Sequence, residues 1–134
     1  MLAAGGHTVA KPFVHVGVHH VSLNVHDAEE TGRFYTEILG MEKLPRPDFG
    51  VPGLWLRCAG QEVHLIQVKE HKTGQAPTMG PHFALRVSDV DAARGALVER
   101  GVKVSEPFQI PGGGRQCFFH DPAGNMIELN QPRV

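Results

Sequence analysis

His20-Val-Ser-Leu-Asn-Val-His-Asp27 has a counterpart 62 residues later, His82-Phe-Ala-Leu-Arg-Val-Ser-Asp89. A second pair of similar segments, residues 59–67 and 123–131, follows in the same order with an offset of 64 residues. The two offsets differ by only two residues, so one short loop insertion accounts for the difference. Two copies are too few for a solenoid, which needs at least three stacked repeats. The chain is therefore predicted to consist of two similar fused modules.

Each module is predicted to have the order β-α-β-β-β. Residues 19–25 and 82–87 alternate between apolar and polar side chains, as half-buried strands do. A helix follows each strand, marked by a capping residue at its start and a glycine at its end. The caps are Asp27, with Glu30 completing a capping box, and Asp89 or Asp91; the glycines are Gly40 and Gly101. Three short strands follow each helix, over 41–47, 53–58 and 61–68 and over 102–109, 115–120 and 125–131.

The expected fold class is α+β, as one domain over residues 1–134. Module one spans about 15–68, a linker about 69–80, and module two about 81–131. Each helix covers the apolar face of a small mixed sheet and leaves the other face open and polar. Two such modules can curl into a cup-shaped mixed sheet with the helices on its outer face.

Composition excludes several classes of protein. The chain has 134 residues, of which 41% are hydrophobic, and this is enough for a real core. Its formal charge of −1 argues against a nucleic-acid partner or an anionic membrane, because both require a basic excess. No apolar run is long enough to span a bilayer. Residues 1–11 lack the features of a secretory signal, and two cysteines, Cys58 and Cys117, are too few for a disulfide framework, so we expect a cytoplasmic protein.

The first and last strands of each module carry metal-ligand side chains at matching points of the repeat. These are His20, His64, His82 and Glu128. Strand alternation places all four on the open face, opposite the helix. Three imidazoles and one carboxylate suit one divalent metal (Zn, Ni, Co, Mn or Fe) and leave one or two positions for water or substrate.

The same stretches resemble a known family. The matching text is residues 20–25 with Phe34-Tyr-Thr-Glu-Ile-Leu-Gly40, then Pro81-His-Phe-Ala-Leu-Arg-Val87 and Phe119-His-Asp-Pro-Ala-Gly-Asn-Met-Ile-Glu128. Over residues 15–131 the chain resembles the vicinal oxygen chelate superfamily. That group includes glyoxalase I, methylmalonyl-CoA epimerase, fosfomycin-resistance thiol transferases, extradiol dioxygenases and bleomycin-resistance proteins. One scaffold serves many chemistries there, so the resemblance implies the fold more firmly than the reaction.

The resemblance also implies roles for the four residues. His20, His82 and Glu128 fall where the family's metal ligands lie. His64 falls where glyoxalase I has a glutamate and the epimerase a glutamine, so it is either a fourth ligand or a nearby acid or base. The glyoxalase reaction uses a carboxylate at the metal to move a proton between adjacent carbons. Among the four residues only Glu128 is able to act as that catalytic base.

Four further residues are candidates for substrate binding. Arg86 lies two positions beyond His82 on the same predicted face, and Arg115 follows a run of three glycines. Either guanidinium can clamp a substrate carboxylate or phosphate. Asn24 is a candidate for the polar wall. Trp55 can stack on a planar substrate, with core packing as the alternative.

These expectations combine into a metal-dependent enzyme that stabilises an enolate-like intermediate of a small substrate with two adjacent oxygens. A glyoxalase-like lyase or isomerase is the first choice. The alternatives are an extradiol-type dioxygenase, a thiol transferase that confers antibiotic resistance, and a non-enzymatic, bleomycin-type binding protein. We also expect a homodimer, in which the cup either closes within one chain or is built from modules of two chains.

Overall fold

The computed structural model describes residues 12–71 and 80–133. Most of the expected linker, and residues 1–11 with the expectation attached to them, lie outside this range. Module one contains β1 (His20–Val25), α1 (Ala28–Arg33), the π-helix η1 (Phe34–Ile38), β2 (Glu42–Leu44), β3 (Gly53–Cys58) and β4 (Gln61–Gln67). Module two contains β5 (His82–Arg86), α2 (Val90–Glu99), β6 (Phe108–Gln109), β7 (Arg115–His120) and β8 (Met126–Gln131). Across the described ranges, no helix has the length and apolar character needed to cross a membrane.

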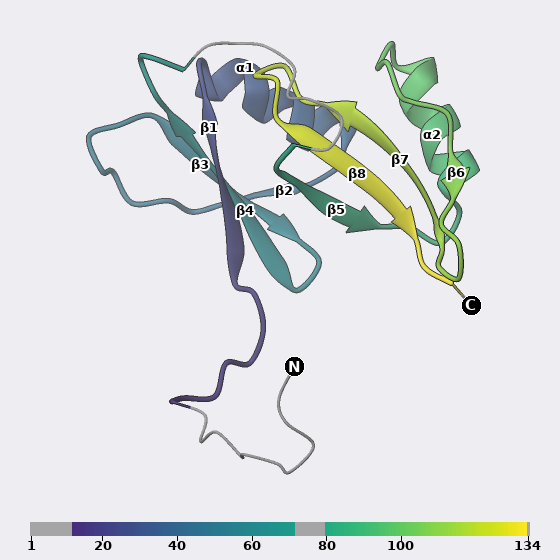
Figure 1. Ribbon diagram of the computed structural model, residues 1–134. Coiled ribbons are helices and arrows are strands. Elements are labelled where there is room, and N and C mark those ends of the chain that lie inside the picture. Colours follow the sequence, from purple (N-terminus) through teal and green to yellow (C-terminus); the bar gives the residue numbers. More distant parts are fainter. Residues whose placement is uncertain (1–11, 72–79, 134) are drawn as a thin grey trace.

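The strands form two four-stranded mixed sheets with the same topology. Sheet A has the order β1-β4-β3-β2 and sheet B the order β5-β8-β7-β6. In each, the first strand runs parallel to the last and the remaining pairs are antiparallel. Figure 1 shows the two sheets with their helices. The predicted α+β class and the two β-α-β-β-β modules are confirmed.

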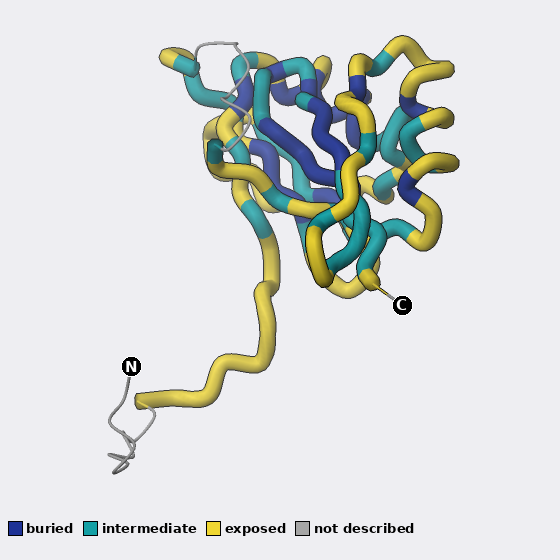
Figure 2. Tube along the Cα trace, turned by 45° about the vertical axis from the view of Figure 1, so that its right-hand side comes forward, coloured by how far each residue is buried: buried dark blue, intermediate teal, exposed yellow. Residues whose placement is uncertain are grey.

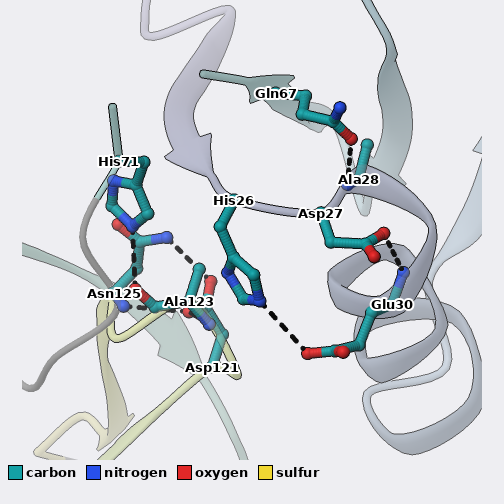
Figure 3. A network of polar contacts seen from close by, with 9 residues as sticks. All are labelled: His26, Asp27, Ala28, Glu30, Gln67, His71, Asp121, Ala123 and Asn125. Carbon is teal, nitrogen blue, oxygen red and sulfur yellow. Dashed lines mark hydrogen bonds and ion pairs between the residues drawn. The ribbon is translucent and has the colours of Figure 1, made fainter. Parts of the chain in front are cut away.

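The repeat extends to the hydrogen bonds that begin each helix. Asp27 accepts a bond from the backbone N–H of Glu30 at 3.0 Å, and Asp89 accepts one from Ala92 at 3.0 Å. Satisfying these N–H groups stabilises a helix start by about 1 kcal/mol. A glutamine at the end of the last strand, Gln67 or Gln131, accepts the first N–H of its own module's helix at 3.0 or 2.9 Å. Figure 3 shows the module-one pair of bonds.

Two details of the first helix differ from the prediction. The side chain of Glu30 does not return to the cap to complete a capping box, because it pairs with His26 Nε2 at 3.4 Å (Figure 3). The helix also widens after Arg33 into η1, where the N–H of Leu39 bonds to the carbonyl of Phe34 at 3.1 Å. Its predicted end is correct, since Gly40 has φ of +74°.

The strands predicted at 41–47 and 102–109 are shorter than expected. Pro45 and Pro47 lack the N–H that a strand ladder requires, and β2 ends at Leu44. In module two the guanidinium of Arg94 binds the carbonyls of Ser105 and Val104 at 2.9 and 3.2 Å. Only Phe108–Gln109 pairs as β6.

Both modules contribute to one hydrophobic core. Phe34 of η1 lies 6.2 Å, centroid to centroid, from Phe119 of β7. The helix-side residues Val21 and Val63 of sheet A line the same small cavity as Phe83 and Leu85 of sheet B. In Figure 2 the buried segments of both sheets lie together at the centre. The helix-side residues of both sheets therefore belong to one shared core.

A buried carboxylate ties the two modules together. Asp121, in the β7–β8 turn, accepts a 2.7 Å bond from the hydroxyl of Tyr35 in η1. Its other acceptor positions take the backbone N–H groups of Ala123 and Asn125 and the side-chain amide of Asn125, each at 2.9 Å. His71 reaches the same turn through the Ala123 carbonyl at 2.9 Å (Figure 3). Burial, with Asp121 nearby, raises the pKa of the Tyr35 phenol, which therefore stays protonated as the donor.

One glycine is required where β7 begins. A Cβ built on Gly114 would overlap the backbone carbonyl oxygen of Gln131. We expect Gly114→Ala to lower the free energy of unfolding by about 3 kcal/mol, because backbone cannot move aside as a flexible side chain can. Urea denaturation measures the loss. Gly60→Ala is the matched control, since its Cβ would meet no atom within 4 Å; equal stability of the two variants would contradict the prediction.

Candidate functional site

Three aromatic rings stack across the open face of sheet A. His64 on β4 lies between Trp55 on β3, at 4.6 Å and 13°, and His20 on β1, at 4.0 Å and 16°. Strand alternation explains this, because Val63 and Leu65 point into the core while His64 points the other way. The stack leaves His64 only 8% exposed. With both ring faces covered, His64 interacts with other groups mainly through its two ring nitrogens.

A carboxylate that the sequence analysis did not single out lies beside this stack. Glu62 precedes His64 by two residues, on the same face of β4, and its Oε1 lies 2.8 Å from His64 Nε2. Its Oε2 lies 4.0 Å from His19 Nε2, and His19 Nδ1 in turn lies 2.9 Å from His20 Nδ1. The bond from His64 is the main cause that lowers the pKa of the Glu62 carboxyl. The two-residue spacing on an alternating strand was the signal that would have found it.

The open face of sheet B carries the second pair. His82 Nε2 on β5 lies 3.0 Å from Glu128 Oε1 on β8, and Asn130 donates to the other carboxylate oxygen at 2.7 Å. His82 Nδ1 lies 2.9 Å from the carbonyl oxygen of Gly80. A carbonyl only accepts, so Nδ1 carries a proton; Nε2 then donates to the carboxylate if the ring is protonated and presents a lone pair if the ring is neutral. That lone pair and the carboxylate then face each other as two acceptors.

The structure brings the four predicted ligands together as two pairs. Within residues 12–71 and 80–133, no three His, Cys, Asp or Glu side chains gather closely enough to hold a metal ion. The pair His20 and His64 lies on the open face of sheet A, and the pair His82 and Glu128 on that of sheet B. The described part of the chain therefore presents two separate pairs of candidate ligands, here called half-sites.

Three of the four predicted substrate-binding residues lie on the open faces, and Arg115 does not. Arg86 lies exposed on β5 on the same side as His82, and Asn24 lies exposed on β1 on the same side as His20. Trp55 belongs to the ring stack on the open face. Arg115 lies two residues before the buried Cys117, so both side chains share one face of β7. Arg115 also pairs with Asp91 of α2, and it therefore lies on the helix side of sheet B. The structure does not bring Arg115 together with the other candidates.

The donor chemistry of both half-sites fits a divalent metal. In module two, the converging lone pairs of His82 Nε2 and Glu128 Oε1 require a cation between them or a proton on one of them. In module one, neutral His64 donates from Nε2 to Glu62, which leaves a lone pair on Nδ1. Imidazole nitrogens and a carboxylate are ordinary ligands of Zn, Ni, Co, Mn and Fe.

Comparison with known proteins identifies the family. The model of the Glyoxalase/Bleomycin resistance protein/Dioxygenase superfamily matches residues 17–129. The chain belongs to this superfamily. It is 29% identical over 119 residues to Glyoxylase I 4 of Arabidopsis thaliana, covering 84% of this chain and 68% of the relative. It is 26% identical over 144 residues to the mitochondrial methylmalonyl-CoA epimerase of Bos taurus, covering 93% and 80%.

A solved structure adds a similar protein of a different kind. The crystal structure of TnmS3, an antibiotic binding protein from Streptomyces sp. CB03234, shares 36% identity with this chain. The two align with a TM-score of 0.70 over 92% of this chain and 100% of that one. The superfamily assignment predicted from the sequence is thus confirmed, and its relatives include both enzymes and a binding protein.

Proposed function

We propose that this protein is a divalent-metal-dependent enzyme, a lyase or isomerase of the glyoxalase kind, that acts on a small substrate with two adjacent oxygens. Its relatives named Glyoxylase I 4 and methylmalonyl-CoA epimerase support this class of reaction. The observation that carries the proposal is the convergence of His82 Nε2 and Glu128 Oε1 at 3.0 Å, with His82 Nδ1 committed to a carbonyl. Two acceptors oriented in this way are suited to a shared cation.

We propose that the complete site is shared between two chains. His20 and His64 of one chain would join His82 and Glu128 of a second copy. This is supported by the position of the two half-sites on separate faces of one shared core. Residues 12–18 project from β1 as an exposed segment (Figure 2) with Phe13, Val14 and Val16 in solvent, which is apolar area that a second copy would cover.

The chain's own residues have distinct tasks in this proposal. When bound, the metal would supply a Lewis acid that polarises two adjacent substrate oxygens. Glu128 is the base that accepts and returns the substrate proton, and Asn130 holds one of its oxygens at 2.7 Å. Arg86, exposed on the His82 side of β5, is placed to bind an anionic substrate group. Asn24 and Trp55 line the opposite wall, on sheet A.

Removing one ligand tests the proposal. We expect His82→Ala and Glu128→Ala each to reduce metal affinity at least tenfold, because each removes a direct ligand. Metal content after equilibrium dialysis, measured by mass spectrometry, gives the result. His26→Ala is the control, since His26 pairs with Glu30 at the start of α1, away from both open faces. Full metal retention by both ligand variants would remove the proposed site.

A second candidate function is binding of an antibiotic-like molecule without turnover. The 36% identity to TnmS3 favours it, together with aromatic rings on both open faces. On sheet B, Phe118 contacts His82 edge-on at 5.4 Å and stacks with the exposed Phe108 at 6.1 Å. A binding protein of this kind would retain its ligand after the metal is removed with a chelator, whereas the enzyme proposed above would lose both metal and activity.

A further inference from the structure

Each ligand candidate on a last strand has a polar partner two residues away on the same face. In module two, Asn130 donates to Glu128 at 2.7 Å. In module one, Glu62 accepts from His64 at 2.8 Å. The repeat does not dictate this, because the positions equivalent to Glu62 and Asn130 in the other module are Met126 and Ile66. The partner of His64 is therefore particular to module one.

We infer that Glu62 is a positioning residue, which holds His64 so that its Nδ1 lone pair is available to the metal. The inference rests on the metal site proposed above. A carboxylate only accepts, so the 2.8 Å contact requires the proton of neutral His64 to lie on Nε2. A histidine ligand commonly donates its second ring nitrogen to a carboxylate, which fixes the tautomer and makes the ligating nitrogen more basic.

The ring stack gives this single hydrogen bond a strong effect on the imidazole. Trp55 and His20 cover both faces of His64, so the ring is restrained from tilting out of the stack. The His64 ring is then free only to rotate within its own plane, and the hydrogen bond from Nε2 to Glu62 fixes that rotation. In the neutral ring, the tautomer of His64 and its rotation within the ring plane are thus set together. Because ring lone pairs lie in the ring plane, the parallel His20 ring has to turn out of the stack to direct a nitrogen at the same ion.

The same carboxylate also reaches towards His20. Glu62 Oε2 lies 4.0 Å from His19 Nε2, and His19 Nδ1 lies 2.9 Å from His20 Nδ1. With Nδ1 of His20 bonded to its neighbour, Nε2 of His20 is the nitrogen left for a ligand. Glu62 thus accepts a hydrogen bond from one proposed ligand and lies 4.0 Å from His19, the neighbour that bonds to the other.

The test replaces Glu62 by residues that do or do not accept a hydrogen bond. Glu62→Met removes the acceptor with the side chain found at the equivalent position 126, and Glu62→Gln retains an amide oxygen. We expect Glu62→Met to lose the slowly exchanging Nε2–H signal of His64 in NMR spectra of ¹⁵N-histidine-labelled, metal-free protein. Its affinity for Zn²⁺ or Ni²⁺, by competition with a chromophoric chelator, should fall about 10- to 100-fold. Glu62→Gln should restore most of the Nε2–H signal and most of the metal affinity.

The control and the outcomes separate this inference from the metal site itself. Glu42→Met removes another carboxylate of sheet A, one that pairs with Arg57 at 3.0 Å, and should change neither measurement. An unchanged Nε2–H signal and unchanged affinity in Glu62→Met would overturn the positioning role. If the wild-type protein showed the locked tautomer but bound no metal, the metal site would fail, while the orientation of His64 by Glu62 would stand.

Discussion

Chains that cannot bind metal alone are expected to bind it when combined. A His20→Ala chain lacks a ligand from module one, and a His82→Ala chain lacks one from module two. If each site joins module one of one chain to module two of the other, a heterodimer of the two variants contains one intact site and one site that lacks two ligands. Co-expression with two different affinity tags isolates this heterodimer. Metal analysis should find about one ion per heterodimer and far less in either parent.

The opposite outcome is equally clear. If the cup closes within one chain, every site in the heterodimer lacks a ligand, and metal binding stays as low as in the parents. That result would overturn the shared site, even if both parents had dimerised. The wild-type dimer, carrying the same tags, should bind about two ions and is the reference for recovery.

Loss of the buried carboxylate between the modules is expected to destabilise the whole chain. Asp121 is 4% exposed and accepts four hydrogen bonds at 2.7–2.9 Å, one from Tyr35 of module one and three from Ala123 and Asn125 within the β7–β8 turn. Asp121→Ala would leave these donors without their acceptor. Hydrogen bonds to a charged group contribute about 1.5–3 kcal/mol each, and several share this carboxylate, so we expect a loss of at least about 3 kcal/mol. Urea denaturation measures it.

Two further variants locate the source of that loss. Tyr35→Phe removes only one of the four donors and should lower the free energy of unfolding by about 1.5 kcal/mol, the lower end of the range for one hydrogen bond to a charged group. Asp48→Ala removes an exposed carboxylate that accepts a local 2.8 Å bond from Gly50, and should change stability by no more than about 0.5 kcal/mol. If Asp121→Ala were as stable as Asp48→Ala, the turn would not be what joins the modules.

The repeated half-fold was predictable because its signals are local. Alternation along β1, β4 and β5 separates core residues from the polar face, and Asp27 and Asp89 lie where their caps were expected. What could not be predicted depends on contacts distant in sequence. Tyr35 and Asp121 are 86 residues apart, and no periodicity links them. The arrangement of the two modules follows from such contacts, and it decides which open faces meet.

The candidate site, too, has features that follow from local patterns and features that depend on distant contacts. Repeat and alternation were enough to place His64 beside His20 and Glu128 beside His82. Arg115 follows a run of three glycines, which says nothing about the direction of its side chain; its position two residues before the buried Cys117 places it on the helix side. Whether the two pairs form one site depends on which modules meet, within one chain or between two, and local patterns in a single sequence do not specify this.

The stack on sheet A gives the molecule an optical reporter of its own. Trp55 is the only tryptophan in the chain, and its indole lies 4.6 Å from the ring of His64, nearly parallel to it. Any positive charge that His64 acquires, from a proton or from a bound cation, is placed against the indole face, where it interacts with the π electrons. The intrinsic fluorescence of the unlabelled protein would therefore follow the occupancy and charge state of His64 directly, in real time and free of background from any other indole.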